Sequence, residues 1–67
     1  MKINVNKLSI AMARARINFS ELSNISKVSR PTLSYIKNGK SCRPDIAAKI
    51  AAALGVDVTE IIETEEG

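Results

Sequence analysis

The chain has 67 residues, of which 45% are hydrophobic and 25% are charged, and its formal net charge is +3. This length allows one small domain, which we expect to span residues 1–67, and a deep catalytic cavity would leave too little apolar core. The absence of His and the presence of a single Cys exclude the usual zinc ligand sets and any Ser-His or Cys-His catalytic pair. We therefore expect a protein that is not an enzyme and that holds no metal or cofactor.

The charges are distributed unevenly along the chain. Residues 1–43 carry nine Lys and Arg side chains and one acidic residue, which gives a net charge of +8. Residues 44–67 carry one Lys and six Asp and Glu side chains, which gives −5. A local excess of positive charge attracts polyanions such as nucleic acids, although an uneven but merely solvated surface would give the same pattern.

The sequence also bears on the compartment. No run of residues is apolar enough to span a bilayer, and the first residues lack the hydrophobic segment of a secretory signal. Cys42 has no second cysteine to pair with, as is typical of proteins in reducing compartments. We expect a cytoplasmic protein with no membrane partner, in which Cys42 is a small hydrophobic residue beneath a loop rather than a redox switch.

Hydrophobic residues at spacings of three and four predict a first helix over residues 6–16, with Ile17 as a buried connector after it. The apolar stripe of this helix consists of Leu8, Ala11, Met12 and Ala15.

A second helix is expected to begin at Asn18. Its side chain can cap the free backbone amides, and Glu21, three residues later, completes a reciprocal capping box. The turn that follows is assigned to Ser26 and Lys27. The side chains expected to face inward are Leu22, Ile25 and Val28.

A third helix is predicted over residues 30–37, with Ser29 as its cap. Pro31 falls in the first turn, where a missing N–H has no intrahelical partner to lose. Gly39 supplies the left-handed conformation that ends the helix. The apolar positions, three residues apart, are Leu33 and Ile36.

Two further helices complete the prediction. The fourth begins at Pro44 and ends at Gly55, and the fifth follows a second capping pair, Asp57 and Glu60. An acidic tail, residues 64–67, is expected to fray. The apolar positions of these two helices are Ala47, Ile50, Ala51, Leu54, Val58, Ile61 and Ile62. Of these, Ile61 and Ile62 either complete the core of the monomer, or one of them lies in a dimer contact.

The second and third segments have the form of a helix-turn-helix, in which two short helices are joined by a tight turn. If Leu33 and Ile36 are buried, the opposite face of the third helix is free to enter the major groove of DNA. The outward positions of that helix are Arg30, Pro31, Ser34, Tyr35 and Lys37.

The stretch LSNISKVSRPTLSYIKNGKSCRP, followed by IAAALGVDVTEII, resembles the phage Cro/repressor-type (Xre-like) helix-turn-helix DNA-binding family. The resemblance covers about residues 6–63, and it rests on the order and spacing of the matching residues together. Those residues are Leu22, Val28, Ser29, Thr32, Leu33, Ser34, Ile36, Asn38, Gly39, Arg43, Pro44, Ala53, Leu54, Gly55 and Val56.

The resemblance implies an all-α, compact, five-helix, lambda-repressor-like domain whose third helix reads DNA. It implies that four side chains face the base edges, namely Arg30, Pro31, Ser34 and Tyr35. It further implies that another set faces the phosphates, namely Asn18, Ser29, Thr32, Asn38, Lys40 and Arg43.

At four positions the chain departs from the pattern of the family. Phe19 stands where a Gln often braces the recognition residues, and Ser23 replaces a small apolar Ala. Lys27 replaces the usual turn glycine, and Lys37 occupies a position that is frequently acidic. These departures affect the preference for a DNA sequence more than the fold.

The resulting prediction is a sequence-specific transcriptional regulator of the repressor kind. It would bind double-stranded DNA as a homodimer that is weak or forms on the DNA. One alternative is an antitoxin or a mobile-element accessory protein that uses the same DNA-binding domain and docks a protein partner of unknown identity. Another alternative is a protein-interaction domain that has lost DNA binding.

Overall fold

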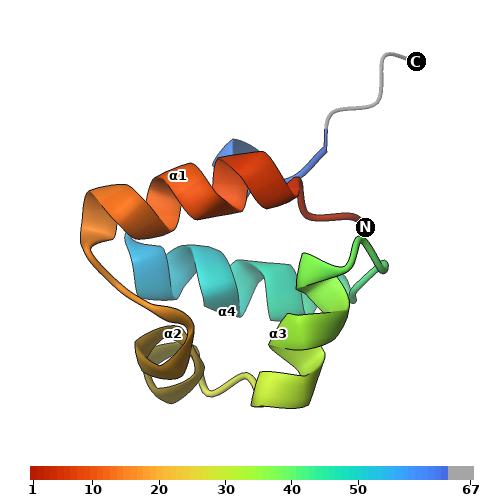
Figure 1. The fold of residues 1–67 in the computed structure, drawn as a ribbon. Helices are drawn as coiled ribbons and strands as arrows, with labels where there is room; N and C mark the ends of the chain where they lie inside the picture. Colours follow the sequence, from red (N-terminus) through yellow and green to blue (C-terminus); the bar gives the residue numbers. More distant parts are fainter. Residues whose placement is uncertain (64–67) are drawn as a thin grey trace.

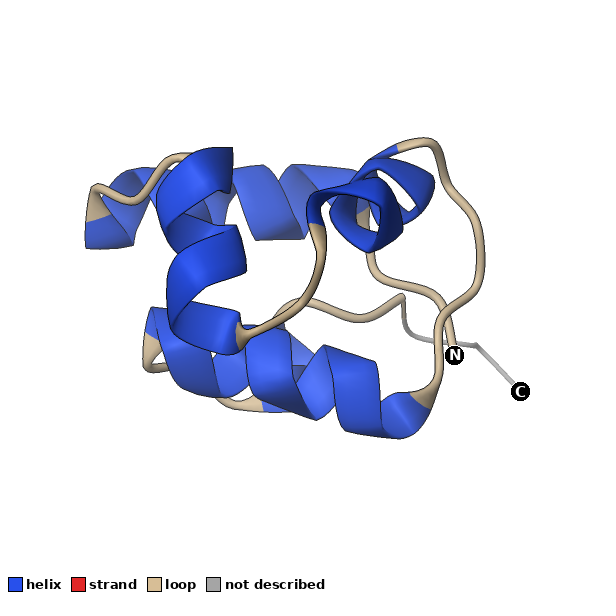
Figure 2. Cartoon of the chain, turned by 90° about the horizontal axis from the view of Figure 1, so that it is seen from below, coloured by secondary structure: helices blue, strands red, loops and turns tan. Residues whose placement is uncertain are grey.

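The structure of the chain is a computed structural model that describes residues 1–63. The described residues form four α-helices and one short 3-10 helix, and they include no strand (Figure 2). The elements are α1 (Val5–Ala15), α2 (Phe19–Ser26), α3 (Arg30–Lys37), α4 (Pro44–Leu54) and η1 (Val58–Glu60). The all-α prediction is confirmed for this part of the chain. The predicted acidic tail, residues 64–67, lies outside the described residues.

Helix α4 is the central element of the fold. It packs against α1, α2 and η1, and α2 in turn packs against α3. In Figure 1, α1 lies along one side of α4, whereas α2 and α3 lie on the other side. Ala47 and Ile50 of α4 are completely buried, because small and apolar side chains on this helix let its neighbours approach closely. Helix α3 is therefore held at the opposite side of the molecule from α1.

Side-chain caps begin four of the five helical elements, at Asn4, Asn18, Ser29 and Asp57. The capping boxes predicted at the start of α2 and of η1 are both present. Helix α4 has no side-chain cap and begins instead with Pro44 at its first position. The cap of α1 was not predicted, and it moves the helix one residue toward the N-terminus, to Val5–Ala15.

The inward face of α2 differs from the prediction. Leu22 is buried as expected, but Ile25 is 52% exposed. Ser26, four residues after Leu22, is buried instead and is the last residue of the helix. Its hydroxyl donates to the carbonyl oxygen of Leu22 at 2.6 Å and accepts from the backbone N–H of Val28 at 3.2 Å. A polar side chain can be buried here because both of these bonds are made.

The prediction of five helices is wrong, because the fifth segment is a 3-10 helix of three residues, Val58–Glu60. Beyond it, backbone groups that would extend a helix bond to the N-terminal segment instead. The carbonyl oxygen of Ile61 accepts from the N–H of Asn4 at 2.8 Å, and the N–H of Glu63 donates to the carbonyl oxygen of Lys2 at 2.9 Å. Ile61 is nevertheless fully buried, so it completes the core of the monomer.

The N-terminal segment ties two distant parts of the chain together. Ile3 is 2% exposed and belongs to the core, although no predicted element contained it. Isolated bridges join Ile3 to Ile62 and Lys2 to Ser41. The N-terminal segment thus connects residues 61–63, which follow η1, with the loop that follows α3.

Lys27 ends α2 in the left-handed conformation, with φ of 64°. This conformation costs an L-residue about 1 kcal/mol, which glycine avoids. We therefore expect Lys27→Gly to raise the free energy of unfolding by about 0.5 kcal/mol, after allowing for the greater freedom of glycine in the unfolded chain.

The matched control is Gly55→Ala, where φ is 71° and an added Cβ would meet no atom within 4 Å. It should lower stability by about 0.5 kcal/mol, because the backbone cost of the left-handed conformation is again partly offset by the difference in freedom between alanine and glycine in the unfolded chain. Urea unfolding of both variants measures the effect, and a destabilised Lys27→Gly would contradict it.

Candidate nucleic-acid interface

Helix α3 is divided into a buried side and an exposed side. Leu33 and Ile36 are 2% and 1% exposed and belong to the core. The four side chains predicted to face DNA bases are all exposed, and they are Arg30, Pro31, Ser34 and Tyr35. The exposed fraction of Tyr35 is 63%, so this aromatic ring contributes little to the core. An exposed helix face of this kind is available to a partner.

Local hydrogen bonds fix both ends of α3. The Ser29 hydroxyl accepts from the backbone N–H of Thr32 at 3.4 Å, and the two hydroxyls of these residues lie 2.8 Å apart. Thr32, which lies in this first turn, is half-buried. At the other end, Gly39 adopts a φ of 86°, and its N–H donates to the carbonyl oxygen of Ile36 at 3.0 Å. The helix therefore ends where the loop begins.

The turn between α2 and α3 is fixed by serine side chains. The Ser23 hydroxyl donates to the carbonyl oxygen of Val28 at 2.7 Å, in addition to the bonds that Ser26 makes. Val28 itself is 3% exposed, so it fills the space beneath the turn as predicted. A Ser in place of the family's Ala at position 23 thus gives this chain an additional bond across the turn.

Arg30 is directed toward α2. Its guanidinium donates through Nη2 to the hydroxyl of Ser20, and both side chains are exposed. A guanidinium has five N–H donors, so most of them are left for another acceptor. The contact holds the arginine at the junction of the two helices.

The side chains predicted to face phosphates lie at the ends of α2 and α3 and in the loop before α4. Asn18, Ser29, Asn38, Lys40 and Arg43 are exposed. The Oδ1 atom of Asn18 already accepts from the N–H of Glu21 at 2.8 Å, which leaves its amide NH₂ as the group that can donate. Arg43 lies 3.4 Å from the carboxylate of Asp45, an exposed ion pair that holds the arginine only weakly.

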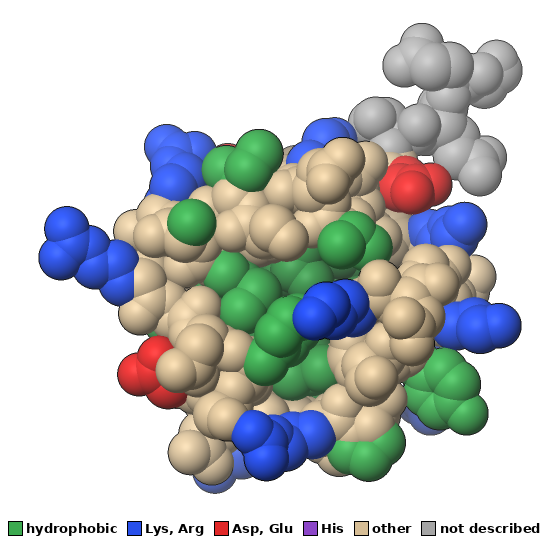
Figure 3. Space-filling view, in the orientation of Figure 1, with side chains coloured by type: hydrophobic (Ala, Val, Ile, Leu, Met, Phe, Trp, Pro, Cys, Tyr) green, Lys and Arg blue, Asp and Glu red, His purple; other side chains and the backbone are tan. Residues whose placement is uncertain are grey.

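Residues 30–43 carry four basic side chains and no acidic one. The exposed side of α3 and the loop after it therefore carry an excess of positive charge. On the face drawn in Figure 3, basic side chains lie around the edge and across a central hollow, and acidic side chains appear at fewer places. This balance suits an anionic partner.

Cys42 lies in the same loop and packs partly against the core. Burial raises the pKa of its thiol above the usual value, with the N-terminal ammonium acting in the opposite direction. A raised pKa leaves less of the reactive thiolate at neutral pH. This agrees with the prediction of a small hydrophobic residue beneath the loop.

Phe19 and Lys37 are not among the residues predicted to contact bases or phosphates. Together with Arg30, Leu33 and Ser34 these residues line a groove of about 190 Å³ between the start of α2 and α3. The Lys37 ammonium lies 5.0 Å from the centre of the Phe19 ring. Both residues depart from the family pattern, and this departure is the feature of the sequence that could have indicated a role for them.

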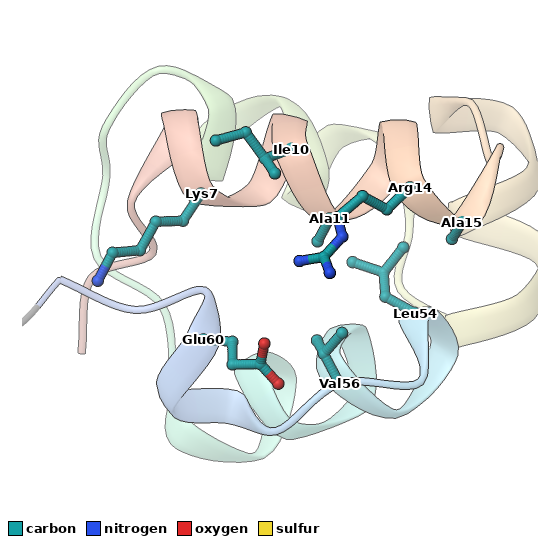
Figure 4. A pocket seen from close by; sticks show the side chains of 8 residues that line it. All are labelled: Lys7, Ile10, Ala11, Arg14, Ala15, Leu54, Val56 and Glu60. Atoms are coloured by element: carbon teal, nitrogen blue, oxygen red, sulfur yellow. The ribbon is translucent and has the colours of Figure 1, made fainter.

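A second hollow, of about 300 Å³, lies between α1 and the segment that follows α4 (Figure 4). Arg14 and Glu60 extend into it, beside Ile10, which is 58% exposed. Lys7 lies at its edge, where its ammonium donates to the carbonyl oxygen of Ile62 at 3.3 Å. None of the residues predicted to contact DNA lines this hollow. Within residues 1–63 there is also no cluster of His, Cys, Asp or Glu that could hold a metal ion, and no helix that is long and apolar enough to cross a membrane.

Comparison with known proteins agrees with this geometry. A family model described as the Cro/C1-type HTH DNA-binding domain matches residues 7–67, which is nearly the whole chain. No curated protein and no solved structure matches the chain.

Proposed function

Since this chain belongs to the Cro/C1-type HTH DNA-binding domain family, we propose that it is a transcriptional repressor whose helix α3 enters the major groove of an operator. Membership in the family supports sequence-specific binding of double-stranded DNA and a role in transcription regulation. Repression would follow when the bound protein blocks access of the polymerase to the promoter. The family is one of DNA-binding regulators rather than of enzymes.

The division of α3 into a buried and an exposed side is the observation that carries this proposal. Leu33 and Ile36 anchor the helix, while its outer face holds small, polar and basic side chains. The major groove is about 12 Å wide and admits an α-helix. A helix attached to its domain along one side can therefore present the other side to the base edges.

Arg30 and Tyr35 are the side chains we assign to the reading of bases, with Ser34 and Pro31 between them. A guanidinium can donate two hydrogen bonds to O6 and N7 of guanine. Tyr35 can pack against the methyl group of a thymine, and the short side chain of Ser34 permits a close approach of the two molecules. The hydrogen bond to Ser20 is compatible with this role for Arg30, because most of the guanidinium donors remain free for a base.

The phosphate contacts are assigned to the ends of the two helices and to the loop before α4. Their side chains are Asn18, Ser29, Thr32, Asn38, Lys40 and Arg43. Backbone contacts of this type supply most of the affinity and fix the register of the protein on the duplex. The N-terminal segment supports the loop, since the N–H of Cys42 donates to the carbonyl oxygen of Met1 at 2.8 Å.

Two substitutions distinguish the side chains that contact bases from those that contact phosphates. Arg30→Ala should cost about 1–3 kcal/mol on the preferred site and little on unrelated duplexes, because it removes a base contact. Lys40→Ala should weaken binding to every duplex alike. It should also reduce the magnitude of the negative slope of log K against log salt by about 1. Binding isotherms on selected and random duplexes at several salt concentrations measure both effects. A uniform loss in both variants would contradict the division.

The functional unit we propose is a homodimer that assembles on a two-fold site. One half-site offers few base contacts, so two α3 helices about 34 Å apart would be needed for specificity. We expect the free protein to sediment as a monomer at low micromolar concentration, and to bind a two-fold site with two copies cooperatively. Analytical ultracentrifugation with duplexes that carry one or two half-sites tests this. Independent binding of single copies to the two-fold site would contradict it.

A further inference from the structure

The groove between the start of α2 and α3 has an apolar floor and a basic rim. Phe19 and Leu33 form the floor, and both belong to or pack against the hydrophobic core. Arg30, Ser34 and Lys37 form the walls. Residues 30, 33, 34 and 37 are spaced as one stripe along a helix, so the groove follows α3 for two turns.

Lys37 is held at the rim by an aromatic ring. Its ammonium lies 5.0 Å from the centre of the Phe19 ring, which is within the range of a cation–π contact. Within the described part of the chain, no side chain or backbone carbonyl accepts a hydrogen bond from this ammonium, and its three donors are available to a ligand.

The charge of the groove indicates an anionic occupant. Two of its five lining residues are cations, and none is a carboxylate. Arg30 is already bonded to Ser20, so Lys37 is the cation with donors left entirely for the occupant. An apolar group would displace water from the ammonium without replacing its hydrogen bonds, which costs free energy.

The size of the groove distinguishes between the parts of a duplex that could enter it. Its volume is about 190 Å³. A thymine methyl group would fill only a small part of this space. A deoxyribose with its phosphate fills it better, and it offers both an apolar face and a negative charge.

We propose that this groove binds one sugar–phosphate unit of the DNA backbone, with the sugar against Phe19 and the phosphate on the Lys37 ammonium. The inference rests on the proposed DNA binding, since the groove shares Arg30 and Ser34 with the face that would read bases. Lys37 is then a phosphate contact beyond those found from the sequence, and Phe19 is the residue that positions it.

The first test removes the charge. Binding is measured on a duplex recovered by selection from a random-sequence pool. Lys37→Gln should reduce the magnitude of the negative slope of log K against log salt by about 0.9 relative to the unmodified protein. The control is Arg14→Gln, which removes the same charge from the hollow between α1 and η1 and should leave the slope nearly unchanged. Equal effects of the two substitutions would overturn the assignment of Lys37.

The second test locates the phosphate. Each linkage of the selected duplex is replaced in turn by an uncharged methylphosphonate. Several linkages should weaken binding of the unmodified protein when they are neutralised. In each half-site, one of them should weaken it several-fold and have no effect on Lys37→Gln. Phe19→Leu keeps an apolar floor but loses the ring face, so it should show a reduced effect at that same linkage while its melting temperature stays close to that of the unmodified protein.

The outcomes separate this inference from the proposed function. If the unmodified protein binds no duplex at low salt, both fail. If it binds but no linkage distinguishes it from Lys37→Gln, only the groove assignment fails. If replacement of a thymine by deoxyuridine weakens binding in a way that depends on Phe19, while no linkage does, the groove takes a methyl group and the assignment is overturned.

Discussion

The burial of Leu33 and Ile36 is the constraint on which the rest of the structure depends. These two side chains fix the rotation of α3 about its own axis, because a helix of two turns has no other apolar face to turn inward. Once they are inside, Arg30, Ser34 and Tyr35 must point outward. The serine hydrogen bonds in the preceding turn then fix the position of the helix relative to α2. The exposed face of α3 is thus a consequence of packing rather than an independent feature.

The departures from the family pattern leave this arrangement intact. Ser23 adds a hydrogen bond across the turn, and Lys27 adopts the left-handed conformation that a glycine would adopt more easily. Phe19 and Lys37 alter the surface beside α3, where an apolar ring and a cation replace the polar and acidic groups typical of the family. The same scaffold therefore carries a different surface between the start of α2 and α3.

The parts of the fold that depend on short-range patterns could be predicted from the sequence. The caps at Asn18 and Ser29, the stops at Gly39 and Gly55, and the buried stripe of α4 follow from spacing alone. The errors concern interactions between distant residues or between competing side chains. Ser26, whose hydroxyl bonds to the Leu22 carbonyl and the Val28 N–H, is buried while Ile25 is exposed. The residues after η1 pair with the N-terminal segment instead of continuing the helix. For the site, every predicted DNA-facing residue except the half-buried Thr32 is exposed, whereas the groove at Phe19 and Lys37 needed the relative placement of two helices.

The central claim is that the outward side of α3 meets the duplex. Titration of the ¹⁵N-labelled protein with a short duplex at low salt, followed by two-dimensional NMR, tests this most directly. The largest changes in amide chemical shift should fall within residues 29–43 and at the start of α2, while the amides of α1 beside Ile10 and Arg14 change little. If the largest changes instead fall around the hollow between α1 and η1, the account of α3 as the DNA-binding element is contradicted.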